Sequence, residues 1–261
     1  MSHHQAWPYA RVLAHRGGGT LAPENTLAGI EMGLQHGYRA IEFDAMLAAD
    51  AIPVLIHDPT LERTTNGSGS VSSLTAAELA RLDAGAWVAP RFAGTHLPSL
   101  TDAIAYCRRN SVWINIEIKP APGHDSVTGA QVARVAAQAY ADVVRPRGDQ
   151  GKSIEPQAPL LSSFSREALG AARSAAPDLP RGLLVGPVPA DWEDQLETLG
   201  CVGLHCSHKH LTQALARTIK DAGYWLFCYT VNEPDRAREL FDWGVDAFCT
   251  DRIDLITPSF T

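Results

Sequence analysis

The sequence predicts an α/β fold, specifically a (β/α)8 barrel with a small insertion after the second strand. Short runs rich in β-branched residues alternate with longer amphipathic segments rich in alanine, leucine, glutamate and arginine, which is typical of strand–helix units around a parallel sheet. Eight strand candidates occur within 261 residues, a length that suits a barrel of eight such units. An open doubly wound sheet usually has fewer strands, so the barrel is favoured.

The predicted strands are separated by segments with helical periodicity. In chain order the strands cover residues 12–15, 40–43, 112–118, 160–163, 182–185, 201–206, 225–230 and 246–250. The helices between them cover 24–36, 99–109, 127–143, 165–175, 190–199, 211–222 and 233–243. Thr212 is a suitable N-cap for the helix at 211–222, and Gly223 supplies a stop before the next strand.

Two stretches do not fit the repeat. Residues 51–98 contain an extra strand at 53–56 and then a turn-rich, partly helical segment, which predicts an insertion over the site. Residues 145–159 are rich in proline, glycine and charge and are predicted to form a surface loop. We therefore expect one domain, residues 1–261, with the insertion at approximately 51–98.

Composition and charge exclude several classes of protein. The chain is 45% apolar and 20% charged, as in soluble globular proteins, and its formal net charge of −7 argues against a nucleic-acid partner. Five cysteines without paired spacing favour a reducing compartment. The first residues lack the pattern of a signal peptide, and no run reaches the roughly 20 apolar residues of a membrane span. We expect a cytoplasmic protein without a membrane span, either monomeric or homodimeric.

Reactive side chains follow the carboxyl ends of the predicted strands, where the active sites of barrels lie. These side chains are His15, Arg16, Glu42, Asp44, His57, Glu117 and Lys119. Because side chains alternate along a strand, Glu42 and Asp44 face one side, and so do Glu117 and Lys119. Both pairs can therefore face the mouth of the barrel.

Three carboxylates in one pocket could not all stay ionised without a cation, because like charges raise one another's pKa. Oxygen ligands without thiolate or imidazole suit a hard ion, Mg²⁺ or Ca²⁺, and the sequence does not distinguish the two. Together with Arg16 and Lys119, a divalent ion on Glu42, Asp44 and Glu117 would make the pocket locally cationic. Such a pocket suits a phosphodiester anion.

Two histidines, His15 and His57, end neighbouring strand segments beside this cluster. Imidazole titrates near neutral pH, so one histidine can accept a proton from an attacking hydroxyl group while the other donates a proton to the leaving alkoxide. Cleavage of a phosphodiester needs that pairing. The residues themselves leave open which histidine is the base.

The chain resembles the glycerophosphodiester phosphodiesterase family, in particular its short bacterial members, from about residue 11 to residue 258. The motifs that carry the resemblance are His15-Arg16-Gly17, Pro23-Glu24-Asn25-Thr26, Glu42-Phe43-Asp44, His57-Asp58, Glu117-Ile118-Lys119, Thr230-Val231-Asn232 and Thr250-Asp251. The resemblance implies a (β/α)8 barrel that uses a divalent metal to hydrolyse deacylated phospholipids, such as glycerophosphocholine or glycerophosphoethanolamine. The products would be glycerol-3-phosphate and an alcohol, and the preferred alcohol is left open.

The resemblance also implies roles for individual residues. His15 and His57 would be the acid and the base, whereas Glu42, Asp44 and Glu117 would hold the metal. The substrate-binding residues would be Arg16 and Lys119 on the phosphate, Glu24 at the entrance, Tyr229 as an aromatic wall and His205 in the pocket. Attack by the glycerol 2-hydroxyl through a cyclic phosphate and direct attack by water both remain open.

Two positions depart from the family's usual residues. Ala51 follows Asp50 where the family often has glycine, which predicts a turn of different shape before the second histidine. Tyr229 precedes Thr-Val-Asn where tryptophan is common, so its hydroxyl could alter how the glycerol end or the alcohol is seated.

Two other functions fit parts of the pattern. Lys119 ends a barrel strand, and a desolvated lysine could form a Schiff base in an aldolase or decarboxylase. A barrel that binds phosphodiesters without catalysis is the other alternative. The acid, base and metal-ligand residues together favour the hydrolase over both.

Overall fold

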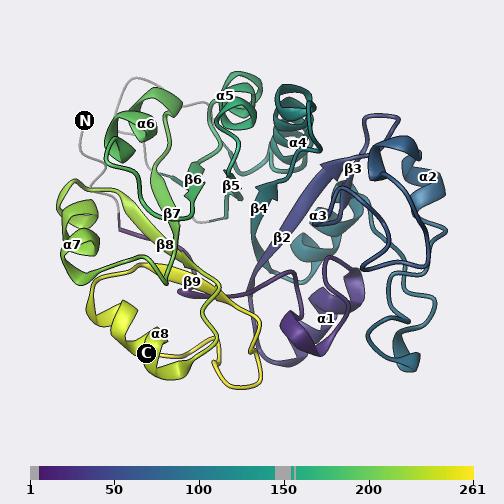
Figure 1. Ribbon diagram of the computed structural model, residues 1–261, viewed down its shortest axis with the longest axis horizontal. Helices are drawn as coiled ribbons and strands as arrows, with labels where there is room; N and C mark the ends of the chain where they lie inside the picture. Colours follow the sequence, from purple (N-terminus) through teal and green to yellow (C-terminus); the bar gives the residue numbers. More distant parts are fainter. Residues whose placement is uncertain (1–5, 145–153, 156) are drawn as a thin grey trace.

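The sheet closes into a barrel because the first strand pairs with both the last strand and the second. The computed structural model describes residues 6–144, 154–155 and 157–261, and most of the predicted loop at 145–159 lies outside this part of the chain. Strand β1 (Val12–Ala14) runs parallel to β9 (Ala247–Thr250) on one side and to β2 (Ala40–Leu47) on the other. The predicted (β/α)8 barrel is therefore confirmed (Figure 1).

The remaining barrel strands follow in chain order around the circle. They are β4 (Trp113–Ile118), β5 (Leu160–Ser163), β6 (Arg181–Val185), β7 (Gly203–Ser207) and β8 (Trp225–Tyr229), and each is parallel to its neighbours. The predicted bounds agree to within a few residues. The largest difference is in β2, which continues to Leu47 because β3 (Pro53–Leu55) folds back and pairs with its end antiparallel.

Helices cover the outside of the barrel, one after most strands (Figure 1). They are α1 (Leu27–Gln35), α3 (Leu100–Arg109), α4 (Asp125–Ala139), α5 (Arg166–Ala175), α6 (Trp192–Leu199), α7 (Gln213–Asp221) and α8 (Pro234–Asp242). Several begin at a capping hydroxyl: the side chains of Thr26, Ser99, Ser165 and Thr212 each accept a hydrogen bond from a backbone N–H of the first turn. The predicted cap at Thr212 is confirmed, and α1 starts three residues later than expected because Thr26 is its cap.

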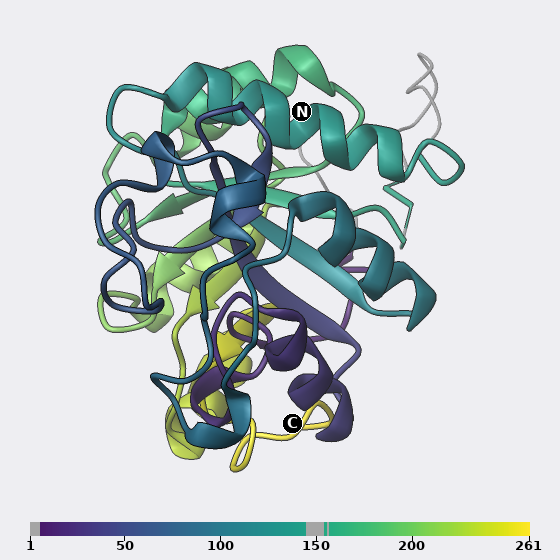
Figure 2. The same ribbon diagram turned by 90° about the vertical axis from the view of Figure 1, so that its right-hand side faces the viewer.

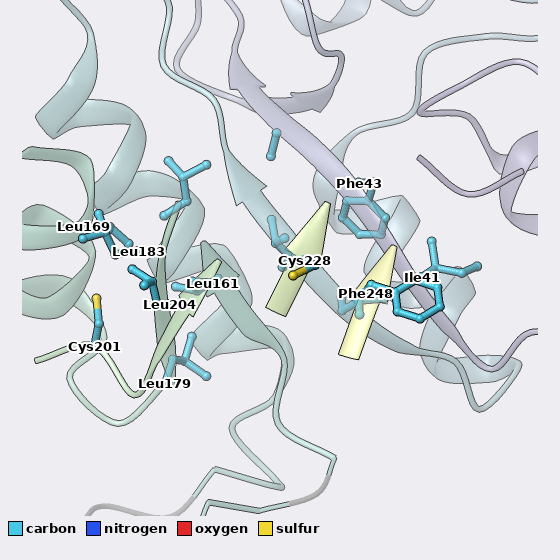
Figure 3. Packing of buried hydrophobic residues seen from close by; sticks show 14 of the residues in the cluster. Ile41, Phe43, Leu161, Leu169, Leu179, Leu183, Cys201, Leu204, Cys228 and Phe248 are labelled. Carbon is cyan, nitrogen blue, oxygen red and sulfur yellow. The ribbon is translucent and has the colours of Figure 1, made fainter. Parts of the chain in front are cut away.

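Successive side chains along a strand point alternately outward into the hydrophobic core and inward toward the site. In β2, Ile41 and Phe43 point outward into the layer between strands and helices, where residues such as Leu169 of α5 and Leu183 of β6 also pack (Figure 3). The intervening residues, Glu42 and Asp44, face the inside of the barrel. The burial of the apolar pair thus fixes the direction of the carboxylates.

Aromatic side chains fill the amino-terminal end of the barrel. Trp7 meets Trp113 and Trp225 edge to face, with ring centroids 5.9 and 5.2 Å apart. Tyr9 stacks on Trp113 with centroids 3.9 Å apart. This aromatic plug, made of Trp7, Tyr9, Trp113 and Trp225, occupies the bottom of the barrel, so the polar interior lies toward the carboxyl ends of the strands.

The segment after β2 forms the predicted insertion beside the barrel mouth (Figure 2). It contains β3, the short helix α2 (Ala76–Leu79) and two single 3-10 turns, Val71–Ser73 and Pro90–Phe92. Ile56, Leu61, Val71 and Leu79 form part of a small apolar cluster of their own. The insertion is therefore held by its own core as well as by the pairing of β3 with β2.

The described residues contain no helix that is both long and apolar enough to cross a membrane. All five cysteines are buried, and none is joined in a disulfide.

The turn before β3 keeps a left-handed backbone at Ala51, whose φ is +59°. Ala51 thus adopts the region that favours glycine, at a cost of about 1 kcal/mol from its Cβ. The difference from the family's usual turn shape stays a prediction. The N–H of Ala51 bonds to the carbonyl of Ala48, and that of Ala48 bonds to the carbonyl of Ile52, so the turn is tightly constrained.

We expect Ala51→Gly to raise the free energy of unfolding by roughly 0.5 kcal/mol, because relief of the strain exceeds the entropy cost of glycine. Urea denaturation measures the change. Ala49→Gly, in the same turn but at a residue without positive φ, is the matched control and should lower stability. A loss of stability in both variants would show that Ala51 is not strained.

Candidate active site

The mouth of the barrel contains a cavity of about 260 Å³. Residues from four of the predicted strand ends meet there: His15, Arg16, Glu42, His57, Glu117 and Lys119 all line it. Asp44 lies directly beside this cavity because it is the register partner of Glu117 on the neighbouring strand. The structure thus brings together the seven reactive residues that the sequence singled out.

Three carboxylates crowd one side of the cavity. Glu42, Asp44 and Glu117 each offer an oxygen, and these oxygens lie within 4.8 Å of one another. Within the described part of the chain, this cluster is the one group of potential metal ligands that meets such a distance limit. The three come from neighbouring strands β2 and β4, so the barrel itself fixes their spacing.

Burial and mutual repulsion oppose full ionisation of this cluster. Burial, together with the charge of Asp44, raises the pKa of both Glu42 and Glu117 above the usual range. Burial also opposes ionisation of Asp44, but Arg16 and Lys119 outweigh it and lower the pKa of that carboxyl. One carboxylate is therefore stabilised by cations, whereas the other two need a further positive charge.

The donor set fits a hard divalent cation. Oxygen Oε1 of Glu42 is buried and has no hydrogen-bond partner among the described residues. A buried carboxylate oxygen without a partner is costly unless it binds something. Mg²⁺ and Ca²⁺ both take carboxylate oxygens, so the residues present fit either ion.

The loop after β1 adopts an unusual backbone to reach this cluster. Arg16 and Asn25 have φ of +50° and +56°, a region that non-glycine residues seldom occupy. The N–H of Arg16 donates to Glu42, and the two ends of the Asn25 amide bond to Asp44, one to its side chain at 2.8 Å and one to its N–H at 3.0 Å. Gly19 has no room for a Cβ, which would lie 2.1 Å from the Asp251 carbonyl oxygen. The strained loop therefore orients two of the three carboxylates.

Both predicted phosphate-binding cations lie against the carboxylates. Arg16 forms an ion pair with Glu24 at 2.7 Å and lies 3.4 Å from Asp44. The ammonium of Lys119 donates to Glu117 at 3.0 Å and lies 3.7 Å from Asp44. Each of the two side chains, Arg16 and Lys119, thus contacts the carboxylate cluster and also lines the cavity.

Each histidine is oriented by an aspartate on its Nδ1 atom. The Nδ1 of His15 lies 2.6 Å from Asp251, and that of His57 lies 2.5 Å from Asp58. The Nε2 of His15 is 3.8 Å from Glu42, whereas the Nε2 of His57 receives a hydrogen bond from Lys119 at 2.7 Å. The Nε2 edge of His15 is therefore turned toward Glu42 of the cluster, whereas that of His57 is occupied by Lys119.

The two imidazoles have opposite pKa shifts. Burial lowers the pKa of His57, and the charges of Arg16 and Lys119 add to the effect. Burial also opposes protonation of His15, but the hydrogen bond to Asp251 and the charge of Glu42 outweigh it and raise the pKa. The charges placed around the two rings thus separate them into a more basic and a less basic imidazole.

Arg63, in the insertion, links the residues around His15 to those around His57. It was not identified from the sequence. Its guanidinium bonds to Asp58 and to both carboxylate oxygens of Glu24. Glu24 in turn accepts a bond from Arg16. The predicted entrance residue Glu24 is therefore the link between the β1 loop and the insertion. No local sequence signal pairs Arg63 with Glu24, which lies 39 residues away along the chain.

Two further residues that were not identified from the sequence, Asn115 and Ser162, also line the cavity. Asn115 precedes Glu117 by two residues and so shares its face, and Ser162 is the register partner of Glu117 on β5. His205 and Tyr229, both predicted to contact substrate, also line the cavity. The Tyr229 hydroxyl donates to the Val185 carbonyl at 2.7 Å, so it is engaged by the backbone.

A second hollow of about 360 Å³ lies beside His15 and Arg16, which line both spaces. We call it the outer hollow, and its other lining residues include Thr20, Ala22, Glu24, Trp87, Val88 and Asp251. Trp87 comes from the insertion and is 46% exposed. The site thus has an inner cavity within the barrel and an outer hollow between the β1 loop and the insertion.

A family model and individual relatives of this chain point to the same protein family. The sequence matches the glycerophosphoryl diester phosphodiesterase family over residues 15–255. A glycerophosphodiester phosphodiesterase of Caldanaerobacter subterraneus subsp. tengcongensis is 30% identical, and the alignment covers 92% of this chain and 93% of that protein. A glycerophosphodiester phosphodiesterase of Bacillus subtilis is also 30% identical, with 93% and 84% covered.

Solved structures agree in fold. A phosphodiesterase of Oleispira antarctica, in complex with the product sn-glycerol-3-phosphate, is 34% identical with a TM-score of 0.81, covering 92% of each chain. A glycerophosphodiester phosphodiesterase of Agrobacterium tumefaciens is 28% identical with a TM-score of 0.74, covering 94% of this chain and 97% of that one. The extent of these matches shows that the chain belongs to the glycerophosphodiester phosphodiesterase family.

Proposed function

We propose that this chain hydrolyses glycerophosphodiesters, such as glycerophosphocholine or glycerophosphoethanolamine, to glycerol-3-phosphate and an alcohol in a metal-dependent reaction. The observation that carries the proposal is the pair of aspartate-held histidines, His15 and His57, beside a buried cluster of three carboxylates. That set supplies a proton acceptor, a proton donor and a cation site at one cavity. The product-bound relative from Oleispira antarctica supports the same substrate class.

Glu42, Asp44 and Glu117 are the residues that would hold Mg²⁺ or Ca²⁺. The ion would supply positive charge for the non-bridging phosphate oxygens as negative charge develops on them. Arg16 and Lys119 lie at the edge of the cluster, where their N–H donors can bind the same oxygens. Asn25 keeps Asp44 in place through its two hydrogen bonds.

We assign His57 as the base and His15 as the acid. An ammonium group only donates, so the Nε2 of His57 accepts from Lys119 and its Nδ1 hydrogen is donated to Asp58. This neutral form can remove the proton from the attacking hydroxyl of water or of the glycerol once Lys119 turns from His57 to the phosphate, because the ammonium otherwise occupies the one lone pair of the ring on Nε2. His15, between Asp251 and Glu42, is surrounded by the charges that favour an imidazolium, which donates its proton to the departing alkoxide.

The outer hollow suits the departing alcohol. It shares His15 and Arg16 with the inner cavity, so it lies next to the proposed acid. Its lining residues come from three separate segments: the β1 loop, the insertion and the segment after β9. The hollow therefore lies between these segments and is not a closed pocket. We therefore propose that the alcohol is accommodated loosely and that the enzyme tolerates several alcohols.

The two other functions receive less support. A Schiff-base lysine needs a free amine, whereas the Nζ of Lys119 lies within 3.7 Å of Asp44, Glu117 and the ring of His57. A barrel that only binds phosphodiesters has no need of two imidazoles each oriented by an aspartate. For location, five buried cysteines without a disulfide support a reducing compartment, for which we propose the cytoplasm.

Incubation with glycerophosphocholine should release glycerol-3-phosphate, measured by coupling to glycerol-3-phosphate dehydrogenase. EDTA should abolish the release, and Mg²⁺ or Ca²⁺ should restore it, because Glu42 and Glu117 need the cation's charge. Full activity in a metal-stripped sample would exclude the metal role. Absence of product with every divalent ion tested would favour the binding-only alternative.

We expect His15→Ala and His57→Ala each to lower kcat by about 10²–10⁴-fold, because each removes one proton transfer. Thermal unfolding should remain cooperative in both variants. His96→Ala, at an exposed histidine in the insertion, is the control and should keep normal turnover. Near-normal kcat in either site variant would contradict the acid and base roles.

A further inference from the structure

The two aspartates that orient the histidines are held by different parts of the fold. The Oδ2 of Asp251 accepts a hydrogen bond at 3.1 Å from the amide of Asn232, in the loop after β8. The Oδ2 of Asp58 accepts one at 2.5 Å from the Nε of Arg63, and the Nη2 of the same guanidinium donates to Oδ1 at 3.1 Å. Asp251 is thus held by a barrel loop, whereas Asp58 is held by a turn of the insertion.

The Arg63 guanidinium is fixed on its other side by Glu24. Its Nη1 donates to one oxygen of Glu24 at 2.7 Å, and its Nη2 donates to the other at 2.9 Å. Because the guanidinium is planar and rigid, the position of Glu24 determines the angle at which Asp58 is held. A lysine ammonium is a point charge without this fork, so it could not hold both carboxylates in the same way.

The backbone around Arg63 is itself constrained. Leu61 is fully buried in the apolar cluster of the insertion. Both the N–H and the hydroxyl of Thr65 donate to the Leu61 carbonyl, which closes a turn around Arg63. The position of the guanidinium therefore depends on the core of the insertion.

Arg63 can act on the reaction only through another residue. The inner cavity and the outer hollow both lack Arg63 among their described lining residues, and its side chain is 43% exposed. Glu24 has a second cation, Arg16, at 2.7 Å. Asp58, in contrast, has Arg63 as its one permanently charged partner among the described residues, because its other ion-pair partner is His57. Loss of Arg63 would therefore affect Asp58 most.

The charge of Arg63 also determines where the proton lies in the pair formed by His57 and Asp58. The hydrogen bonds from Arg63 lower the pKa of Asp58 below its usual range, so this carboxylate stays ionised. An ionised carboxylate only accepts hydrogen bonds, so the hydrogen between the two side chains belongs to the Nδ1 of His57. The Nε2 of the ring is left as the proton acceptor.

We propose that Arg63 is a positioning residue for the base: by holding Asp58, it keeps the His57 ring in one orientation and in the tautomer with its hydrogen on Nδ1. The inference rests on the proposed function, because it takes His57 to be the base. It gives the insertion a part in proton transfer, although Arg63 itself touches neither the substrate nor the reacting atoms.

Steady-state kinetics with glycerophosphocholine and Mg²⁺ tests this role. Arg63→Gln should lower kcat roughly 10–100-fold, the size expected when charge-assisted hydrogen bonds are lost. It should change KM less than about 3-fold, because Arg16 keeps its ion pair with Glu24. Arg63→Lys, which keeps the charge without the fork, should lower kcat at least about 3-fold. Arg81→Gln, at an exposed arginine of the same insertion, is the matched control and should keep the wild-type kcat.

A double-mutant cycle separates an indirect role from direct contact with the substrate. Asp58→Ala removes the group through which Arg63 acts. Addition of Arg63→Gln to Asp58→Ala should therefore lower kcat by less than about a further 3-fold. A further loss of about 10-fold or more in the double variant would overturn the inference.

Nitrogen-15 NMR of the full chain with labelled histidines gives a readout that does not depend on turnover. The ring nitrogens of His57 should report one tautomer in the wild-type chain and a mixture in Arg63→Gln. The signals of His15 should stay unchanged, because Asn232 holds its aspartate. Unchanged His57 signals and unchanged kcat in folded Arg63→Gln would overturn the inference.

Urea denaturation establishes that each variant is folded. If Arg63→Gln does not fold, Arg63→Lys decides instead, and wild-type kcat and His57 signals in that variant would overturn the inference. Absence of product with the wild-type chain would overturn the proposed function itself. The His57 signals would then still show whether Arg63 positions the ring.

Discussion

The crowding of Glu42, Asp44 and Glu117 is the constraint on which the rest of the site depends. Three carboxylates with oxygens within 4.8 Å of one another repel, and burial removes the water that would screen them. Arg16 and Lys119 neutralise part of this charge, and the strained loop at Arg16 and Asn25 supplies hydrogen bonds for more. The remainder is the negative charge that the proposed divalent ion would neutralise.

Much of the fold was predictable because the alternation of side chains along a strand places apolar residues in the core and polar residues in the site. Along β2, the outward residues Ile41 and Phe43 must be apolar, so the polar residues between them must face inward, and the sequence pattern alone locates both. The same reasoning, applied to β4, would have found Asn115 two residues before Glu117. Ser162 required knowledge of which strands are neighbours and in which register, which local sequence does not contain.

Other features depend on the backbone or on distant contacts. The left-handed backbone of Ala51 has no sequence signal, because hydrogen bonds around the turn hold it in a conformation that its own side chain disfavours. Arg63 has no motif, and its role follows only from the folding of the insertion against the β1 loop. Through Glu24 and Asp58, this one side chain connects Arg16 to the neighbourhood of His57. The roles of the seven reactive residues stay predictions, although the structure places them together.

The aromatic plug connects distant parts of the chain. Trp7 packs against Trp225, so one of the first described residues is in contact with the eighth strand in the sequence. The bottom of the barrel therefore cannot be sealed until nearly the whole chain has been arranged around it. Contacts between residues so far apart in sequence slow folding, because the intervening chain must lose its entropy first. Because the first strand has only three residues, the side-chain contacts of the aromatic plug add to the backbone pairing that closes the barrel.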